Sequence, residues 1–167
     1  MMSNVIRIDE TTIHEIEDAD DVGSYNHSVI QANLAFLLKR LSKYSVLTEL
    51  SLDASQLTAH QFQVKDEIKP DVCAYLKRSL SRPFDILKMA EMPLLVIEIL
   101  SPRQGAQEIL EKFAAYFALG VKSCWLVDPT TAIVAVYAAL DQYKTFSSGE
   151  VIDETLDIRL PLAEIFE

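Results

Sequence analysis

Residues 93–102 read PLLVIEILSP, an apolar run between two prolines that a single acid, Glu98, interrupts. Short continuous apolar runs of this kind are typical of a β-strand that is covered on both faces. A carboxylate in such a strand is unfavourable unless it is paired, hydrogen-bonded or bound to a metal ion. Glu98 is therefore the first candidate functional residue of the chain.

A second strand is predicted upstream, where residues 69–76 read KPDVCAYL and place Asp71 at the start of the strand. Further along the chain, a predicted helix carries Lys112. If the two strands are neighbours, Asp71 and Glu98 supply the hard oxygen ligands that Mg²⁺ prefers. A lysine beside them can position an attacking water or stabilise developing negative charge. These residues predict a site for metal-dependent phosphodiester cleavage that holds Mg²⁺ or Mn²⁺.

The remaining periodicities predict a chain in which helices and strands alternate. A helix is expected over residues 24–41, then a strand over 44–52, a turn at Asp53 and a short return strand over 57–64. The two acid-bearing strands are followed by a helix over 105–119, which Gly120 ends, and by a strand over 121–127. An antiparallel pair is then expected over 133–137 and 142–146, and a terminal helix over 160–166. The core order is helix–three strands–helix–strand. Because a helix joins the Glu98 strand to the next strand, the sheet must contain a parallel pair, and the fold class is α/β.

Length and charge predict one domain with an acidic arm. The 167 residues are 50% hydrophobic and 24% charged, as in a globular protein. Residues 1–23 are expected to be an acidic amino-terminal arm with a short strand over 5–8, and residues 24–167 a single domain. The net charge of −10 comes from the two ends of the sequence. Residues 1–21 hold seven acids and one base, and residues 147–167 hold six acids and one base. With no basic stripe between them, avid sequence-independent DNA binding is not expected.

Several classes of protein are excluded by what the sequence lacks. No apolar run reaches the roughly 20 residues of a membrane span, and the amino terminus does not have the layout of a secretory signal. Cys73 and Cys124 lie in predicted strands and are expected to be reduced core residues. Two cysteines and three scattered histidines do not form a zinc site at these spacings. We therefore expect a cytoplasmic protein without a membrane segment.

Five short motifs carry a resemblance to a known family. They are Pro-Asp at 70–71, VIEILSP at 96–102, Lys112 with Tyr116, Gly-Val at 120–121 and WLVDP at 125–129. Together they resemble the bacterial Uma-two family of restriction-endonuclease-like proteins, which belongs to the PD-(D/E)XK nuclease superfamily. The resemblance extends from about residue 26 to residue 166. It implies a restriction-endonuclease-like mixed β-sheet flanked by helices, and an endonuclease that hydrolyses DNA with a divalent metal.

The resemblance also implies roles for individual residues. Asp71 corresponds to the aspartate of the superfamily's Pro-Asp motif, and Glu98 to the acid of its second strand. The superfamily's lysine usually follows two residues after that acid, where this chain has Leu100. Relatives in the family draw a lysine from the following helix instead, and Lys112 is the matching position.

Glu49 and Glu108 are supporting candidates, because similar chains often have an acid at these positions. Each candidate also has a purely structural interpretation. Glu98 could be neutralised by a buried base, and Asp71 could shape the turn that enters its strand. Glu108 and Lys112 could form an ordinary ion pair on the helix surface, four residues apart, and Glu49 could be an exposed strand residue.

Two further features are ambiguous. His27 is interpreted as a polar residue at a helix start rather than as a catalytic base. The loop over residues 77–91 is a candidate for phosphate contact or an ordinary solvated loop, and it contains Lys77, Arg78, Arg82 and Lys88.

The leading hypothesis is a metal-dependent DNA endonuclease that works as a homodimer, since a symmetric pair of sites cuts two strands most simply. The alternative is a catalytically inactive nuclease-like fold that acts as an interaction or regulatory module, which Leu100 and the acidic ends favour. An enzyme acting on small phosphorylated substrates has less support. The chain contains only four glycines and no glycine-rich phosphate loop.

Overall fold

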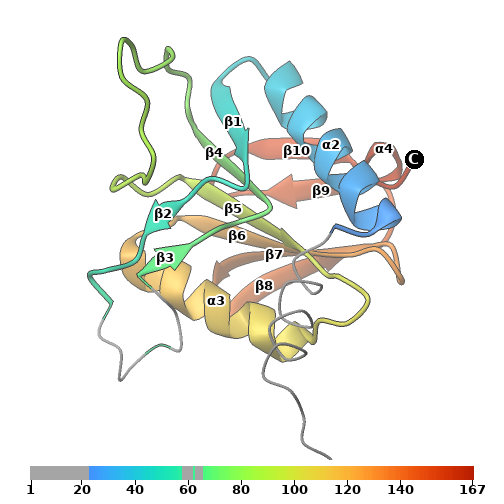
Figure 1. Ribbon diagram of the computed structural model, residues 1–167. Coiled ribbons are helices and arrows are strands. Elements are labelled where there is room, and N and C mark those ends of the chain that lie inside the picture. The colour runs from blue at the N-terminus through green and yellow to red at the C-terminus, as the bar shows by residue number, and fades with distance from the viewer. Residues whose placement is uncertain (1–22, 58–61, 63–65) are drawn as a thin grey trace, which may run out of the picture.

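A six-stranded mixed sheet forms the middle of the protein (Figure 1). The structure is a computed structural model, and it describes residues 23–57, 62 and 66–167. From one edge to the other, the sheet consists of β1 (Tyr44–Thr48), β4 (Val72–Leu76), β5 (Leu95–Ile99), β6 (Ser123–Asp128), β7 (Ile133–Ala139) and β8 (Gln142–Phe146). β5 and β6 are parallel, and every other neighbouring pair is antiparallel. The expected mixed α/β architecture is confirmed.

The parallel pair depends on the crossover helix α3 (Ala106–Leu119). This helix ends at Gly120, whose φ of 105° lies in the left-handed region that glycine adopts without steric cost. The N–H of Val121 donates to the carbonyl oxygen of Tyr116 at 3.0 Å and completes the cap. The chain can therefore turn directly into β6, and Glu98 lies in register with Leu126 of that strand.

Two helices cover opposite faces of the sheet, α2 (Tyr25–Arg40) on one face and α3 on the other (Figure 1). Along β5, Leu95 and Ile97 belong to the core cluster under α2, whereas Val96 belongs to the cluster under α3. Because both faces are covered, every residue of β5 is buried. This double burial explains the almost unbroken apolar sequence of the strand.

A small unit packs on the α2 side of the sheet. It consists of the hairpin β9 (Glu150–Asp153) and β10 (Ile158–Pro161) and the short helix α4 (Leu162–Ile165). Asp153 is 1% exposed and ties this hairpin to β6. Its Oδ2 accepts hydrogen bonds from Ser123 Oγ at 2.5 Å and Trp125 Nε1 at 2.8 Å. β6 thus supplies two donors to this oxygen, and the N–H of Leu156 donates to Oδ1 at 3.2 Å.

Several predicted boundaries differ from the observed ones. The strand expected over 44–52 ends at Thr48, because Glu49 takes a φ of 53° and turns the chain away. Asp53 does not stand in a turn but in β2 (Leu52–Asp53), which pairs with β3 (Glu67–Ile68). The terminal helix expected over 160–166 is limited to α4, since the residues before it form the unexpected strand β10. The arm at 1–23 and the return strand at 57–64 fall almost entirely outside the described residues.

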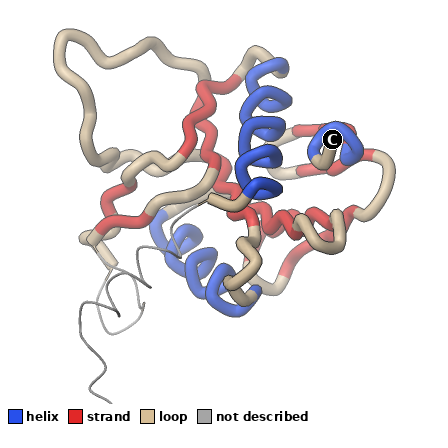
Figure 2. The backbone as a smooth tube through the Cα atoms, turned by 45° about the vertical axis from the view of Figure 1, so that its right-hand side comes forward, coloured by secondary structure: helices blue, strands red, loops and turns tan. Residues whose placement is uncertain are grey.

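The loop that joins β4 to β5 projects away from the sheet, as the tan tube in Figure 2 shows. The loop follows Leu76, the last residue of β4, whereas Asp71 directly precedes the first. The loop and Asp71 are therefore at the two different ends of this strand. Elsewhere, no helix among the described residues is long and apolar enough to cross a membrane.

Candidate active site

Glu98 occupies a buried position on the face of β5 that α3 covers. Its side chain is 3% exposed, and two donors from α3 reach it. The hydroxyl of Tyr116 donates to Oε1 at 2.8 Å, and Lys112 Nζ donates to Oε2 at 3.2 Å. Burial raises the pKa of Glu98 to about 7, an effect that the Lys112 charge and the Tyr116 hydrogen bond oppose and the Asp71 charge reinforces. Leu100 packs against the core on the α3 side, so α3 rather than β5 supplies the lysine.

Asp71 lies beside Glu98 at the start of the neighbouring strand. Its Oδ2 accepts a hydrogen bond of 2.6 Å from the backbone N–H of Ile99, the residue that follows Glu98. Its Oδ1 lies 3.1 Å from Nε2 of His27. The backbone carbonyl of Asp71 accepts a hydrogen bond of 2.9 Å from Gln31 Nε2. Asp71 is therefore held by β5 on one side and by α2 on the other.

His27 is a site residue that the sequence interpretation assigned to a helix start alone. Ser24 does cap the helix and accepts a hydrogen bond from the His27 N–H at 3.4 Å. The imidazole is buried, however, and the hydrogen bond to Asp71 raises its pKa, while burial acts in the opposite direction. The position of His27 relative to the apolar residues of the helix could have indicated this burial. His27 precedes Ile30 and Leu34 by three and seven residues, so it lies on the buried face of α2.

Glu49 reaches the site through an unusual backbone conformation. Its φ of 53° is in the left-handed region, which costs energy for a residue with a side chain. Its N–H donates to the carbonyl oxygens of Pro70 and Asp71 at 3.1 and 3.3 Å. These hydrogen bonds hold Glu49 next to the start of β4.

Glu108 and Lys112 do not form the surface pair that their spacing allowed. Lys112 Nζ turns toward the sheet and contacts Glu98, and Glu108 Oε1 instead accepts a hydrogen bond of 3.0 Å from Gln104 Nε2. Burial lowers the pKa of Lys112, but the charge and hydrogen bond of Glu98 outweigh it, so the pKa is raised and the ammonium stays charged.

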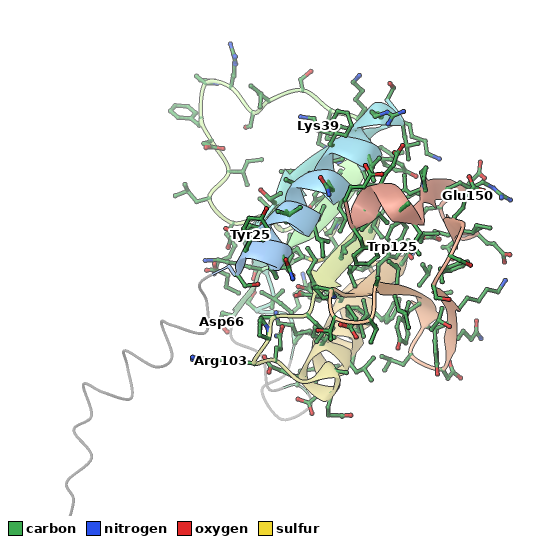
Figure 3. The ribbon with its side chains drawn as sticks, turned by 90° about the vertical axis from the view of Figure 1, so that its right-hand side faces the viewer. Tyr25, Lys39, Asp66, Arg103, Trp125 and Glu150 are labelled. Carbon is green, nitrogen blue, oxygen red and sulfur yellow. The ribbon has the colours of Figure 1, made fainter. Side chains whose placement is uncertain are left out.

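These side chains surround one cavity of about 300 Å³. All five residues predicted from the sequence line it, together with His27 and two further cations. The lining residues are Gly23, His27, Glu49, Lys69, Pro70, Asp71, Glu98, Ser101, Arg103, Gln104, Glu108 and Lys112. Arg103, which also lines the cavity, is an exposed residue that Figure 3 labels at the edge of the molecule. The cavity combines acids that can bind a metal with cations that can bind phosphate.

The donor set of this cavity fits a magnesium-type ion. The described residues contain no group of three histidines, cysteines or acids that could enclose a metal. Mg²⁺ does not require one, because it is usually held by one or two carboxylates and keeps several waters. Each oxygen of Asp71 and Glu98 has one partner, and a carboxylate oxygen has room for a second. Two oxygen ligands without sulfur favour Mg²⁺ or Mn²⁺ over zinc.

A mixed sheet between two helices, with two acids and a helical lysine around a cavity beside the central strands, defines a protein of the restriction-endonuclease-like class. The chain belongs to the Uma2 (Uma-two) family, described as "putative restriction endonuclease", whose model matches residues 15–163. The resemblance deduced from the motifs is thus confirmed.

Solved structures contain the same fold. One from Anabaena variabilis ATCC 29413, described as a "putative nuclease belonging to DUF820", matches with a TM-score of 0.64 and 20% sequence identity. The match covers 86% of this chain and 81% of that one. At this level of identity the likeness demonstrates a shared fold. A comparison with the curated proteins gave no match.

Proposed function

We propose that this protein is a metal-dependent endonuclease that hydrolyses phosphodiester bonds in DNA. The observation that carries the proposal is the convergence of Asp71, Glu98 and Lys112 on one cavity of about 300 Å³. The family supports a nuclease, and the charges of the cavity support a phosphodiester substrate.

In this proposal, Asp71 and Glu98 hold Mg²⁺ or Mn²⁺. When bound, the ion would polarise a phosphoryl oxygen and lower the pKa of a water molecule. Tyr116 keeps the carboxylate of Glu98 in place, because its hydroxyl donates to Oε1. His27 and the Ile99 N–H do the same for Asp71. The two acids are therefore held in position before a metal or a substrate arrives.

In this proposal, the cations of the cavity act on the attacking water and on phosphate groups. Lys112 Nζ, at 3.2 Å from Glu98 Oε2, lies where it can orient the attacking water or stabilise charge that develops on the phosphate. Lys69 and Arg103 line the same cavity and favour the binding of substrate phosphates.

Mn²⁺ titration calorimetry combined with DNA cleavage tests this proposal. The wild type should bind Mn²⁺ and cleave duplex DNA, and Asp71→Ala and Glu98→Ala should lose both. Glu154→Ala is the matched control, since Glu154 is an exposed acid just after β9 that pairs with Lys144 of β8, outside the cavity. A pure wild-type protein that binds no Mn²⁺ and leaves varied DNA substrates intact would overturn the proposal.

Lys112→Met separates metal binding from catalysis. We expect the cleavage rate to fall at least about 100-fold, as is typical for the loss of a group that acts on the attacking water or the developing charge. Mn²⁺ should still bind to the variant at pH 9, because both carboxylate ligands remain and the higher pKa of Glu98 without the Lys112 charge matters least at high pH. If Mn²⁺ binding disappears together with cleavage, Lys112 acts only as a structural support for Glu98.

A second candidate function is an interaction module without catalysis. The observation in its favour is that every oxygen of the two acids already has a donor within the chain. Under this hypothesis the Lys112–Glu98 pair is a structural ion pair. Asp71→Ala would then leave every biological activity of the protein unchanged.

A further inference from the structure

The loop between β4 and β5 concentrates apolar surface. Nine large apolar side chains are exposed among the described residues, and five of them lie between residues 76 and 87. Those five are Leu76 (61% exposed), Leu80 (77%), Phe84 (81%), Ile86 (47%) and Leu87 (88%). A monomeric protein rarely holds so many such side chains together in water, and a local concentration of them is characteristic of a contact surface.

The base of this loop is fastened to the rest of the protein. Arg78 forms two hydrogen bonds with the carboxylate of Glu91, at 2.7 and 3.2 Å, and so closes the base. The N–H of Arg78 donates to Ser45 Oγ of β1 at 2.9 Å, and the N–H of Met89 donates to the Ser51 carbonyl oxygen at 2.8 Å. Both ends of the loop are thus held to the rest of the protein, and the apolar side chains between them are exposed.

Positive charge accompanies these apolar side chains. Arg78 is engaged by Glu91, but Lys77, Arg82 and Lys88 are exposed along the loop and outnumber its other acid, Asp85. In a chain with a net charge of −10, this cluster is suited to an anionic partner. Apolar side chains that enter a DNA groove, with cations beside them on the phosphates, are an established mode of duplex binding.

The position of the loop agrees with such a partner. Figure 1 shows the loop beyond one end of β4, whereas Asp71, which lines the cavity, precedes the other end. β4 separates the two, with Asp71 before its first residue and the loop after its last. Five residues of strand span roughly 17 Å, about half of the ~34 Å helical turn of DNA. A duplex that lies along β4 with its scissile phosphate in the cavity would present a groove to the loop about half a turn away.

We infer that the loop over residues 77–91 binds a groove of duplex DNA, with Phe84 and Leu87 against the bases and Arg82 on the phosphates. The inference rests on the proposed action on DNA and adds the surface that holds the duplex. The competing occupant is a second copy of this chain, to which the same apolar side chains would bind.

The test measures DNA binding without cleavage. Fluorescence anisotropy with a labelled 30-base-pair duplex in EDTA compares the wild type with the double variant Phe84→Ser/Leu87→Ser. The double variant should bind at least about tenfold more weakly, since two large apolar contacts are lost. Arg82→Ala should lower the slope of log Kd against log salt by about 0.9, the value for one lost phosphate contact. Leu140→Ser, at an exposed apolar residue outside the loop, is the matched control and should bind normally.

The outcomes separate this inference from the proposed function. Equal affinity of the loop variant and the wild type, or no duplex binding by the wild type, overturns the inference. A loop variant that binds DNA normally but halves the molar mass in light scattering also overturns it, and identifies the loop as a contact between copies. If the loop variant loses binding but the wild type never cleaves DNA with Mn²⁺, the inference stands and the proposed nuclease activity fails.

Discussion

At the scale of single residues, the carboxyl group of Glu98 is subject to opposing influences. Burial disfavours its charged form, and the nearby charge of Asp71 does the same. The ammonium of Lys112 and the hydroxyl of Tyr116 favour the charged form, but they do not prevail, and the pKa rises to about 7. The metal-free protein therefore contains a buried acid that changes its charge near neutral pH.

This raised pKa makes the stability of the metal-free protein depend on pH. An acid whose pKa rises on folding stabilises the folded state below its unfolded pKa of about 4.5, and that stability is lost as the pH rises through about 7. The raised pKa of His27 has the same sign, because its contribution is lost as the pH rises above 6.5. Urea unfolding in EDTA should therefore give a free energy of unfolding that falls between pH 5 and pH 8.

Glu98→Gln measures how much of this pH dependence of stability comes from Glu98. The variant should match the wild type near pH 5, exceed it in stability at pH 8, and show a flatter profile between them. The decline that remains above pH 6.5 belongs to His27. An identical pH profile in the two proteins would mean that Glu98 is already ionised at low pH and forms a stable ion pair with Lys112.

Tyr116→Phe removes one hydroxyl group and leaves the aromatic ring in the core. Without the donor to Oε1, Glu98 is less firmly oriented, and loss of such a supporting contact typically weakens metal affinity about 10- to 100-fold. Tyr75→Phe is the control, because its hydroxyl also donates a hydrogen bond in a buried setting, but to the carbonyl oxygen of Glu91. Calorimetry with Mn²⁺ should show weaker binding in the first variant only. Equal binding in both would mean that the Tyr116 hydroxyl serves stability alone.

At the scale of elements, the site depends on how four segments meet. β5 presents Glu98 to α3, and the N–H of Ile99 binds Asp71 of the neighbouring strand. From the opposite face, α2 contributes His27 to the same acid. Because each acid is held by a segment other than its own strand, a shift of α3 or α2 relative to the sheet would disturb the site before it unfolded the core.

Gly120→Ala tests the turn that places α3 over β5. A methyl group there meets no atom within 4 Å, so the cost comes only from the left-handed φ of 105°. We expect the free energy of unfolding to fall by about 1 kcal/mol. Gly105→Ala at the other end of α3 is the control, since its φ of −87° suits any residue, and its effect should stay within about 0.5 kcal/mol. Equal effects in urea unfolding would show that the turn does not require glycine.

At the scale of the whole molecule, the proposed cleavage of both DNA strands depends on the number of candidate sites per particle. One copy of the chain contains one cavity with Asp71 and Glu98, whereas a DNA duplex has two strands to cut. We expect a homodimer with two-fold symmetry, which brings a site to each strand. Light scattering at micromolar concentration should give twice the 18.8 kDa mass of the chain. A monomeric mass that persists on DNA would mean that the strands are nicked one at a time.

Much of this molecule could be predicted from local sequence signals. Because β5 is buried on both faces, its sequence is an almost unbroken apolar run. Gly120 marks the end of α3, because the residue at that position takes a positive φ that favours glycine. Asp71, Glu98, Lys112, Glu49 and Glu108 could be named in advance and all line one cavity, while their catalytic roles remain proposals.

The features that escaped prediction depend on contacts between distant parts of the chain. The partner of His27 follows from the way α2 packs on the sheet, and no local pattern encodes that contact. The hairpin of β9 and β10 consists of short strands, and the buried partners of Asp153 lie on β6. The end of β1 was misplaced for a different reason, because a positive φ at Glu49 has no signature in residue type.

The buried hydrogen bond between Trp125 and Asp153 gives the protein an optical reporter. Trp125 is the single tryptophan of the sequence, it is 0% exposed, and it lies in register with Ile97, next to Glu98 on β5. Its fluorescence should be shielded from iodide quenching in the native state and should shift to longer wavelength when β6 separates from the core. Opening of the strand pair that supports the site can therefore be followed in solution without an added label.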